Sequence, residues 1–164
     1  MKIPFLKTHP DAVIPTRGSA GAAGFDLTCV SVKRAGGLLI CDTGISLEIP
    51  AGYFGAVYPR SSIFFTGLEL TNGVGVIDSD FRAPISAIFR EVPGDSEARR
   101  RALLELYPSK RHMMTPYKPG DRIAQLIFSC PHGRAWDDDG CIPFEDGCWR
   151  AAARKAVSER ESHE

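Results

Sequence analysis

Residues 71–82 (TNGVGVIDSDFR) combine side chains and turn residues that could bind and cleave a small molecule. Asn72-Gly73 is a strong β-hairpin signal, and Gly75 would let a flat ligand approach the backbone closely. A base seated in such a hairpin could be read by main-chain N–H and C=O groups and by the Asn72 amide. The segment therefore predicts a pocket for a planar, polar ligand.

Two carboxylates follow this predicted hairpin. Asp78 closes an apolar strand-like run, and Asp80 lies two residues further along. Two acids in this place are unusual for a purely structural role, and a carboxylate there can act as a general base and activate water. Asp78 is therefore the candidate catalytic residue.

Residues 59–62 (PRSS) follow a second strand-like run. They place the Arg60 guanidinium beside the hydroxyl groups of Ser61 and Ser62, which together form a good set of donors for phosphate oxygens. The same residues are equally compatible with a plain turn, so the segment alone leaves both interpretations open.

Residues 23–27 (AGFDL) and 120–128 (GDRIAQLIF) each carry polar side chains among apolar neighbours. Burial of the Asp26 carboxylate is costly unless it is hydrogen-bonded or paired, and Gln125 must likewise find a partner. For Arg122 and Asp121 we favour pairing with other charges as part of the scaffold over direct contact with a substrate.

The elements that must position these residues are predicted to be short strands. Apolar runs are broken by Gly and Pro, and residues 85–89 alternate so that the odd positions share one face. This pattern favours an all-β fold, an antiparallel barrel or sandwich. The runs are residues 38–41, 45–49, 53–58, 74–77, 85–89 and 122–128.

Residues 91–119 interrupt the strand pattern. We predict one short helix over residues 96–107, with Leu103, Leu106 and Tyr107 against the barrel and the three arginines 99–101 facing water. The insertion is interpreted as a solvated surface segment, with a partner-binding or regulatory arm as the alternative. Residues 149–164 are predicted to form a helix that frays into a polar tail.

Composition limits the classes of protein to consider. The 164 residues, 43% of them hydrophobic, suit one domain spanning residues 1–164. Equal numbers of basic and acidic residues, 20 each, offer no field for nucleic acid or an anionic membrane, and no apolar run is long enough for a membrane span.

The five cysteines lack a CxxC pair, so we expect reduced thiols and a cytoplasmic, reducing location. A zinc site built from Cys130, His132, Cys141 and Cys148 is an alternative, but its spacings match no common zinc module.

Taken together and in order, AGFDL, PRSS, GVGVIDSDFR and GDRIAQLIF resemble the first four of the five motifs of the trimeric dUTPase family. The resemblance covers about residues 13 to 128. It implies a jelly-roll-like antiparallel β-barrel in a homotrimer, with active sites between subunits and hydrolysis of dUTP to dUMP and pyrophosphate. It also implies Mg²⁺ bridging the substrate phosphates, with no direct protein ligand.

The resemblance also implies residue roles. Asp78 would activate the water that attacks the α-phosphorus, and Phe81 would lie under the sugar, where the family usually has tyrosine. Asp26, Asp80 and Arg122 would support the site. Uracil would be bound by Asn72, Gly75, Val76 and Ile77, and phosphate oxygens by Arg60, Ser61, Ser62 and Gln125.

The sequence departs from the family at its end, where the glycine-rich fifth motif is not recognisable. An unrelated segment such as residues 144–154 could replace it, the arm could be supplied differently, or it could be lost together with part of the activity. A nucleotide-sensing regulatory protein is therefore the alternative function. A dCTP deaminase is a third, but it would need a glutamate where this chain has Ile88, which cannot move protons.

Overall fold

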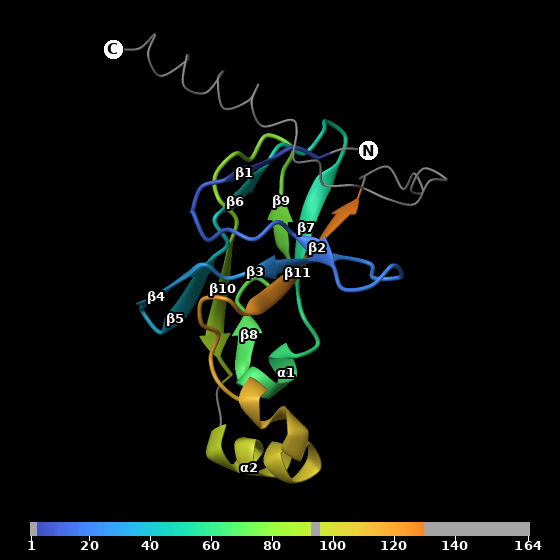
Figure 1. The fold of residues 1–164 in the computed structure, drawn as a ribbon. Helices are drawn as coiled ribbons and strands as arrows, with labels where there is room; N and C mark the ends of the chain where they lie inside the picture. The colour runs from blue at the N-terminus through green and yellow to red at the C-terminus, as the bar shows by residue number, and fades with distance from the viewer. Residues whose placement is uncertain (1–2, 93–95, 130–164) are drawn as a thin grey trace.

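The computed structural model describes residues 3–92 and 96–129, in which short strands predominate (Figure 1). The helices are α1 (Ile63–Thr66), α2 (Ser96–Leu106) and the 3₁₀ helix η1 (Pro108–Met113). The strands are β1 (Phe5–Lys7), β2 (Thr16–Arg17), β3 (Phe25–Thr28), β4 (Ser31–Ala35), β5 (Leu38–Asp42), β6 (Ile45–Leu47), β7 (Phe54–Pro59), β8 (Leu68–Leu70), β9 (Gly75–Ile77), β10 (Ser86–Glu91) and β11 (Arg122–Ser129).

The strands pair antiparallel in three sheets. The largest has the order β2-β3-β11-β7-β9, a second has the order β4-β5-β10-β8, and β1 pairs with β6. The predicted all-β class is confirmed. The closed barrel is not seen in the described residues, because β9 and β8 end their respective sheets without pairing with each other.

One hydrophobic core draws residues from all three sheets. Phe25 and Phe128 meet edge to face with ring centroids 6.1 Å apart, and Phe89 contributes from the second sheet. In β10 the predicted alternation is confirmed, since Ala87 and Phe89 are buried while Ser86 is exposed. The alternation means that only the exposed face of β10 is available to a ligand.

The prediction of a hairpin at Asn72-Gly73 is wrong. Gly73 does form a tight turn, with φ at 66° and its N–H donated to Leu70 O at 3.1 Å. However, β8 before the turn pairs with β10, and β9 after it pairs with β7. The turn therefore passes the chain from one sheet to another, because each flanking strand has a longer partner elsewhere.

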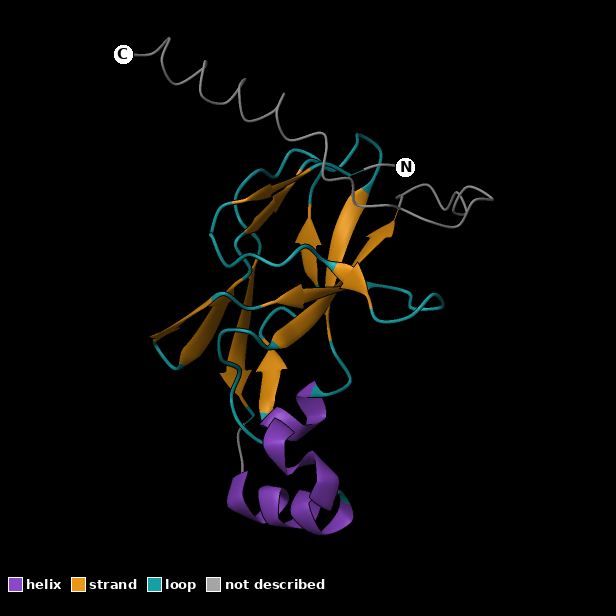
Figure 2. Ribbon diagram, in the orientation of Figure 1, coloured by secondary structure: helices purple, strands orange, loops and turns teal. Residues whose placement is uncertain are grey.

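The predicted helix of the insertion is confirmed as α2, and η1 follows it. Figure 2 shows these helices gathered with α1 at one end of the molecule. Two details of the prediction are wrong: Leu106 is 71% exposed, and Arg99 contacts α1 instead of facing water. Leu103 is buried, as predicted.

Several predictions fall on residues outside those described. These are the helical tail over residues 149–164, the alternative zinc ligands Cys130, His132, Cys141 and Cys148, and any replacement of the fifth motif. The single domain over residues 1–164 stays a prediction for the same reason. Within the described residues, Cys29 and Cys41 are buried free thiols, and no helix is long and apolar enough to cross a membrane.

Candidate functional site

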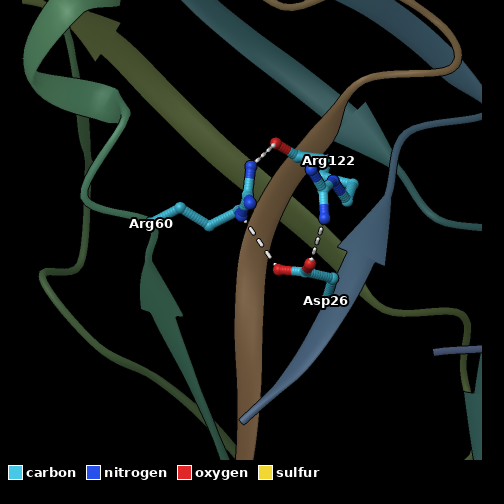
Figure 3. A network of polar contacts seen from close by, with 3 residues as sticks. All are labelled: Asp26, Arg60 and Arg122. Carbon is cyan, nitrogen blue, oxygen red and sulfur yellow. Dashed lines mark hydrogen bonds and ion pairs between the residues drawn. The ribbon is translucent and has the colours of Figure 1, made fainter. Parts of the chain in front are cut away.

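A network of polar contacts joins three of the predicted site residues (Figure 3). Asp26 on β3 lies between Arg60, which follows β7, and Arg122, the first residue of β11. Arg122 Nη1 donates to Asp26 Oδ2 at 2.9 Å. Arg60 Nε lies 2.9 Å from Oδ1, and Arg60 Nη1 donates to Arg122 O at 3.3 Å. The Arg60–Asp26 contact is an ion pair without an aligned hydrogen bond, since buried Nε meets no acceptor at hydrogen-bond geometry among the described residues.

Strand register places this cluster on the outer face of the five-stranded sheet. Asp26 lies opposite Gln125 of β11, and Gln125 lies opposite Tyr58 of β7. Directly opposed residues of antiparallel strands point to the same face. The alternate residues Phe25 and Leu126 are buried in the core. The charged and amide groups therefore share the face that the core does not use.

Gly24 allows β3 to begin close to β11. A Cβ at this position would lie 3.0 Å from Ile127 Cγ1 and 3.2 Å from Leu126 O, so a larger residue would push the two strands apart. The close approach is two residues before Asp26, on the strand that carries its carboxylate.

The cluster carries a surplus of positive charge. Two guanidinium groups face one carboxylate, which leaves a net charge of one positive unit. The Asp26 side chain is only 12% exposed, while that of Arg122 is 56% exposed. Ser61 and Ser62 follow Arg60, and the Ser62 hydroxyl makes no capping hydrogen bond to α1. Such an arrangement suits a phosphate group, because arginine and hydroxyl donors match its oxygens.

The Asn72–Gly75 turn leads into β9 at the edge of the same sheet. A Cβ on Gly75 would lie 3.3 Å from Asn72 Nδ2, so the amide sits directly over this glycine. Val76 is 60% exposed. The Asn72 amide and the main chain of Gly75, which were expected to hydrogen-bond a base, are therefore near one another and close to the surface.

The segment after β9 presents two exposed acids. Neither the Asp78 nor the Asp80 carboxylate has an ion-pair or hydrogen-bond partner in the described part of the chain. The loop is held by its backbone, since Phe81 N–H donates to Asp78 O at 3.1 Å and Arg82 Nη1 donates to Ser79 O at 2.6 Å. Phe81 is partly exposed beside them. Asp78 thus faces solvent and not the interior.

The two groups of predicted site residues lie far apart within one chain. Ile77 is opposite Gly55 in the pairing of β9 with β7, so Asp78, the next residue, lies beside the start of β7. Arg60 follows Pro59, the last residue of β7. The intervening extended chain spans roughly 20 Å. Asp78 and Arg60 of one chain therefore cannot contact the same phosphorus atom.

Comparison with known proteins shows the family of this chain. The sequence profile of the dUTPase family matches residues 10–92, and the deoxyuridine 5'-triphosphate nucleotidohydrolase of Wolinella succinogenes is 41% identical over 132 residues, covering 79% of this chain and 76% of that protein. The chain belongs to the dUTPase family. The nucleotidohydrolase of Paramecium bursaria Chlorella virus 1 is 37% identical over 125 residues, covering 74% of each chain.

Solved dUTPase structures share the fold. A mutant dUTPase of Staphylococcus bacteriophage 80alpha superposes with a TM-score of 0.59 at 16% identity, covering 88% of this chain and 98% of that one. A mutant dUTPase of phage phi11 of S. aureus, which coordinates a structural Mg(II) ion, gives a TM-score of 0.58 at 16% identity, covering 88% and 97%. These likenesses support the all-β fold of this dUTPase family member.

Sequence reasoning missed one residue beside the cluster. Tyr117 lies between η1 and β11, is 7% exposed, and packs on Phe89 with ring centroids 5.0 Å apart. Burial raises the pKa of Tyr117 to about 12, although the Arg60 charge and the nearby Ser62 side chain act in the opposite direction. An aromatic residue just before a predicted core strand indicated burial, but nothing in the sequence pointed its hydroxyl toward Arg60 and Ser62.

Proposed function

We propose that this chain hydrolyses dUTP to dUMP and pyrophosphate, using Asp78 to orient and deprotonate the attacking water. The observation that carries the proposal is the exposed Asp78 carboxylate, which has no partner among the residues that the structure describes and directly follows the strand that begins at Gly75. Membership of the dUTPase family, and the activity named for its relatives, supply the substrate. A free carboxylate near the surface can accept a proton from water.

Uracil recognition is assigned to the turn before β9. The Asn72 amide and the main chain of Gly75, Val76 and Ile77 would hydrogen-bond the edge of the base, which has both donors and acceptors. Phe81 would pack under the deoxyribose, where its ring disfavours a 2′-hydroxyl. It retains the packing surface of the family's usual tyrosine and lacks the hydroxyl.

Phosphate binding is assigned to the cluster on the outer face of the sheet. Arg60, Ser61, Ser62 and Gln125 would donate to phosphate oxygens, and Asp26 and Arg122 would hold Arg60 in place. Preorganised donors of this kind stabilise negative charge that develops in the transition state. The net positive charge of the cluster favours a triphosphate.

The residues fit a magnesium ion held mainly by the substrate. No group of three or more metal-ligating side chains occurs in the part of the chain that the structure describes, and Asp26 is already engaged by two arginines. Mg²⁺ accepts substrate phosphates and waters as most of its ligands, and it would neutralise phosphate charge when bound. Asp80, an exposed carboxylate, would accept hydrogen bonds from its waters.

The active form is proposed to be a homotrimer with active sites between subunits. One nucleotide must meet both Asp78 and the Arg60–Ser62 turn, yet these are roughly 20 Å apart along β7 of one chain. The simplest solution is that one subunit supplies the base turn with Asp78 and another supplies the phosphate cluster. A cytoplasmic, reducing location is proposed with it, supported by the free thiols of Cys29 and Cys41.

The decisive experiment is an assay of pyrophosphate release with dUTP and Mg²⁺, in the full chain and in the Asp78→Asn variant. We expect the variant to lose at least about a hundredfold in kcat while binding dUTP with similar affinity, because general-base catalysis contributes this much. Turnover of the variant within about tenfold of the parent would exclude the assigned role. Retained dUTP binding with no hydrolysis in the parent would favour the nucleotide sensor.

A further inference from the structure

The helix of the insertion, α2, is anchored on α1 near both ends of α2. Arg99 Nη2 donates to Phe64 O at 2.8 Å, and its guanidinium lies 5.5 Å from the centroid of the Phe64 ring. At the other end of α2, Tyr107 meets Phe65 edge to face with centroids 5.4 Å apart. A charged hydrogen bond and two ring contacts thus hold a helix of only four residues.

α1 in turn determines the shape of the phosphate-binding turn. Ile63 N–H donates to Arg60 O at 2.9 Å, and Phe65 N–H donates to Ser62 O at 3.0 Å. The first turn of α1 is therefore built on the carbonyl groups of the residues assigned to phosphate. A displacement of α1 would move Arg60 and Ser62 with it.

Tyr117 approaches the same turn from the return segment of the insertion. Its ring is fixed against Phe89, and its buried hydroxyl meets no partner at hydrogen-bond geometry within the described residues. The Ser62 side chain is near enough to influence its pKa, as is the Arg60 charge. A buried hydroxyl left unpaired is costly, so a small movement of Ser62 that completes this hydrogen bond would be favourable.

We propose that residues 96–117 form a brace that positions the Arg60–Ser62 turn for the phosphates of the nucleotide, with Arg99 and Tyr117 as positioning residues. Arg99 holds α1 at Phe64, and Tyr117 donates to Ser62 when that turn closes on phosphate oxygens. The brace rests on the proposed function, since it acts on the turn assigned to dUTP phosphates. It gives the insertion a role within its own chain.

The role of Arg99 is tested by Arg99→Ala, with Arg101→Ala as the matched control because Arg101 is an exposed arginine of the same helix. We expect Arg99→Ala to raise KM for dUTP about tenfold, the scale of one lost charged hydrogen bond, with a smaller change in kcat. Arg101→Ala should stay within about twofold. Binding of deoxyuridine, which has no phosphates, should be equal in both variants by NMR titration, whereas general damage to the fold would weaken it in Arg99→Ala.

The role of Tyr117 is tested by Tyr117→Phe, alone and combined with Ser62→Ala. The phenylalanine keeps the ring packing on Phe89, so thermal unfolding should be unchanged while KM for dUTP rises about fivefold. In the Ser62→Ala background the same substitution should add nothing, because Tyr117 acts through Ser62. Equal losses in both backgrounds, or no loss in either, would overturn this part of the brace.

The outcomes separate the brace from the proposed function. If the parent chain does not hydrolyse dUTP, the proposed function fails and the brace fails with it. If the parent is active and Arg99→Ala and Tyr117→Phe both behave like Arg101→Ala, the brace alone is wrong. Should Arg99→Ala not fold, Arg99→Lys replaces it: this variant keeps the charge but loses the planar donor group, and an unchanged KM for dUTP in it would count against the brace.

Discussion

Tyr117 illustrates how a single buried hydroxyl connects packing to chemistry. Its ring contributes to the core with Phe89, yet its oxygen lies toward the charged cluster. Burial favours the neutral phenol over the phenolate. The residue therefore couples the stability of the folded chain to alkaline pH.

The folded chain should lose stability above pH 10 through this group. The pKa of Tyr117 is about 12 in the folded state against 10 in the unfolded state, so the stabilising contribution is complete below pH 10 and is lost as pH rises toward 12. Between pH 9 and 11 the free energy of unfolding should fall by about 1 kcal/mol more in the parent than in Tyr117→Phe. Urea unfolding at both pH values measures this, and an identical pH dependence of the two proteins would contradict it.

The sequence predicted that a buried polar side chain in the site must have a partner. A carboxylate in an apolar segment needs partners, and Asp26 has two arginines within 2.9 Å. The preference for Arg122 as scaffold also agrees with its ion pair to Asp26. The identity of the partners was not predictable, because Arg60 and Arg122 are brought together only by the register of β3, β7 and β11.

At the scale of elements, local signals predicted strands better than they predicted pairing. Alternation at Ile85, Ala87 and Phe89 identified the buried face of β10 correctly. Asn72-Gly73 predicted a turn correctly and a hairpin wrongly, since a turn signal does not determine which strands pair. The Arg99 contact was missed because α1, its partner, is a short helix with no strong pattern of its own.

Thr43 makes a buried side-chain connection between the segment before β10 and the start of β6. Its hydroxyl is buried, donates to Ile85 O at 2.7 Å, and accepts from Ile45 N–H at 3.3 Å. Thr43→Val keeps the shape and removes both bonds, which should lower the free energy of unfolding by about 1–3 kcal/mol.

Thr71→Val is the matched control for this prediction. The Thr71 hydroxyl also donates to a main-chain carbonyl, Ile88 O at 3.0 Å, but Thr71 is exposed. Water can replace the lost partner there, so the change should stay within about 0.5 kcal/mol. Chemical denaturation of both variants measures the free energy of unfolding. An equal loss in Thr43→Val and Thr71→Val would mean that burial is not what makes Thr43 important.

At the scale of the whole molecule, the main constraint on function is the length of β7. Its two ends separate Asp78 from Arg60 by roughly 20 Å, so the residues assigned to one reaction cannot meet in a single chain. β9 is an edge strand of the five-stranded sheet, and Val76 on it is 60% exposed. Among the described residues no strand covers this edge, so a neighbouring copy can reach it. A sequence pattern lists site residues without giving the distances between them, and this separation follows only from the register of β7 and β9.

Mixing two inactive variants tests this arrangement directly. Asp78→Asn lacks the proposed general base and Arg60→Ala lacks the proposed phosphate donor, so each pure variant should be nearly inactive. When the two are unfolded together in equal amounts and refolded, chains assort at random, and about one quarter of the sites should combine an intact Asp78 from one subunit with an intact Arg60 from another. Pyrophosphate release should therefore recover to about a quarter of the parent rate. If both residues acted within one chain, every site would keep one defect, and the mixture would remain as inactive as either variant refolded alone.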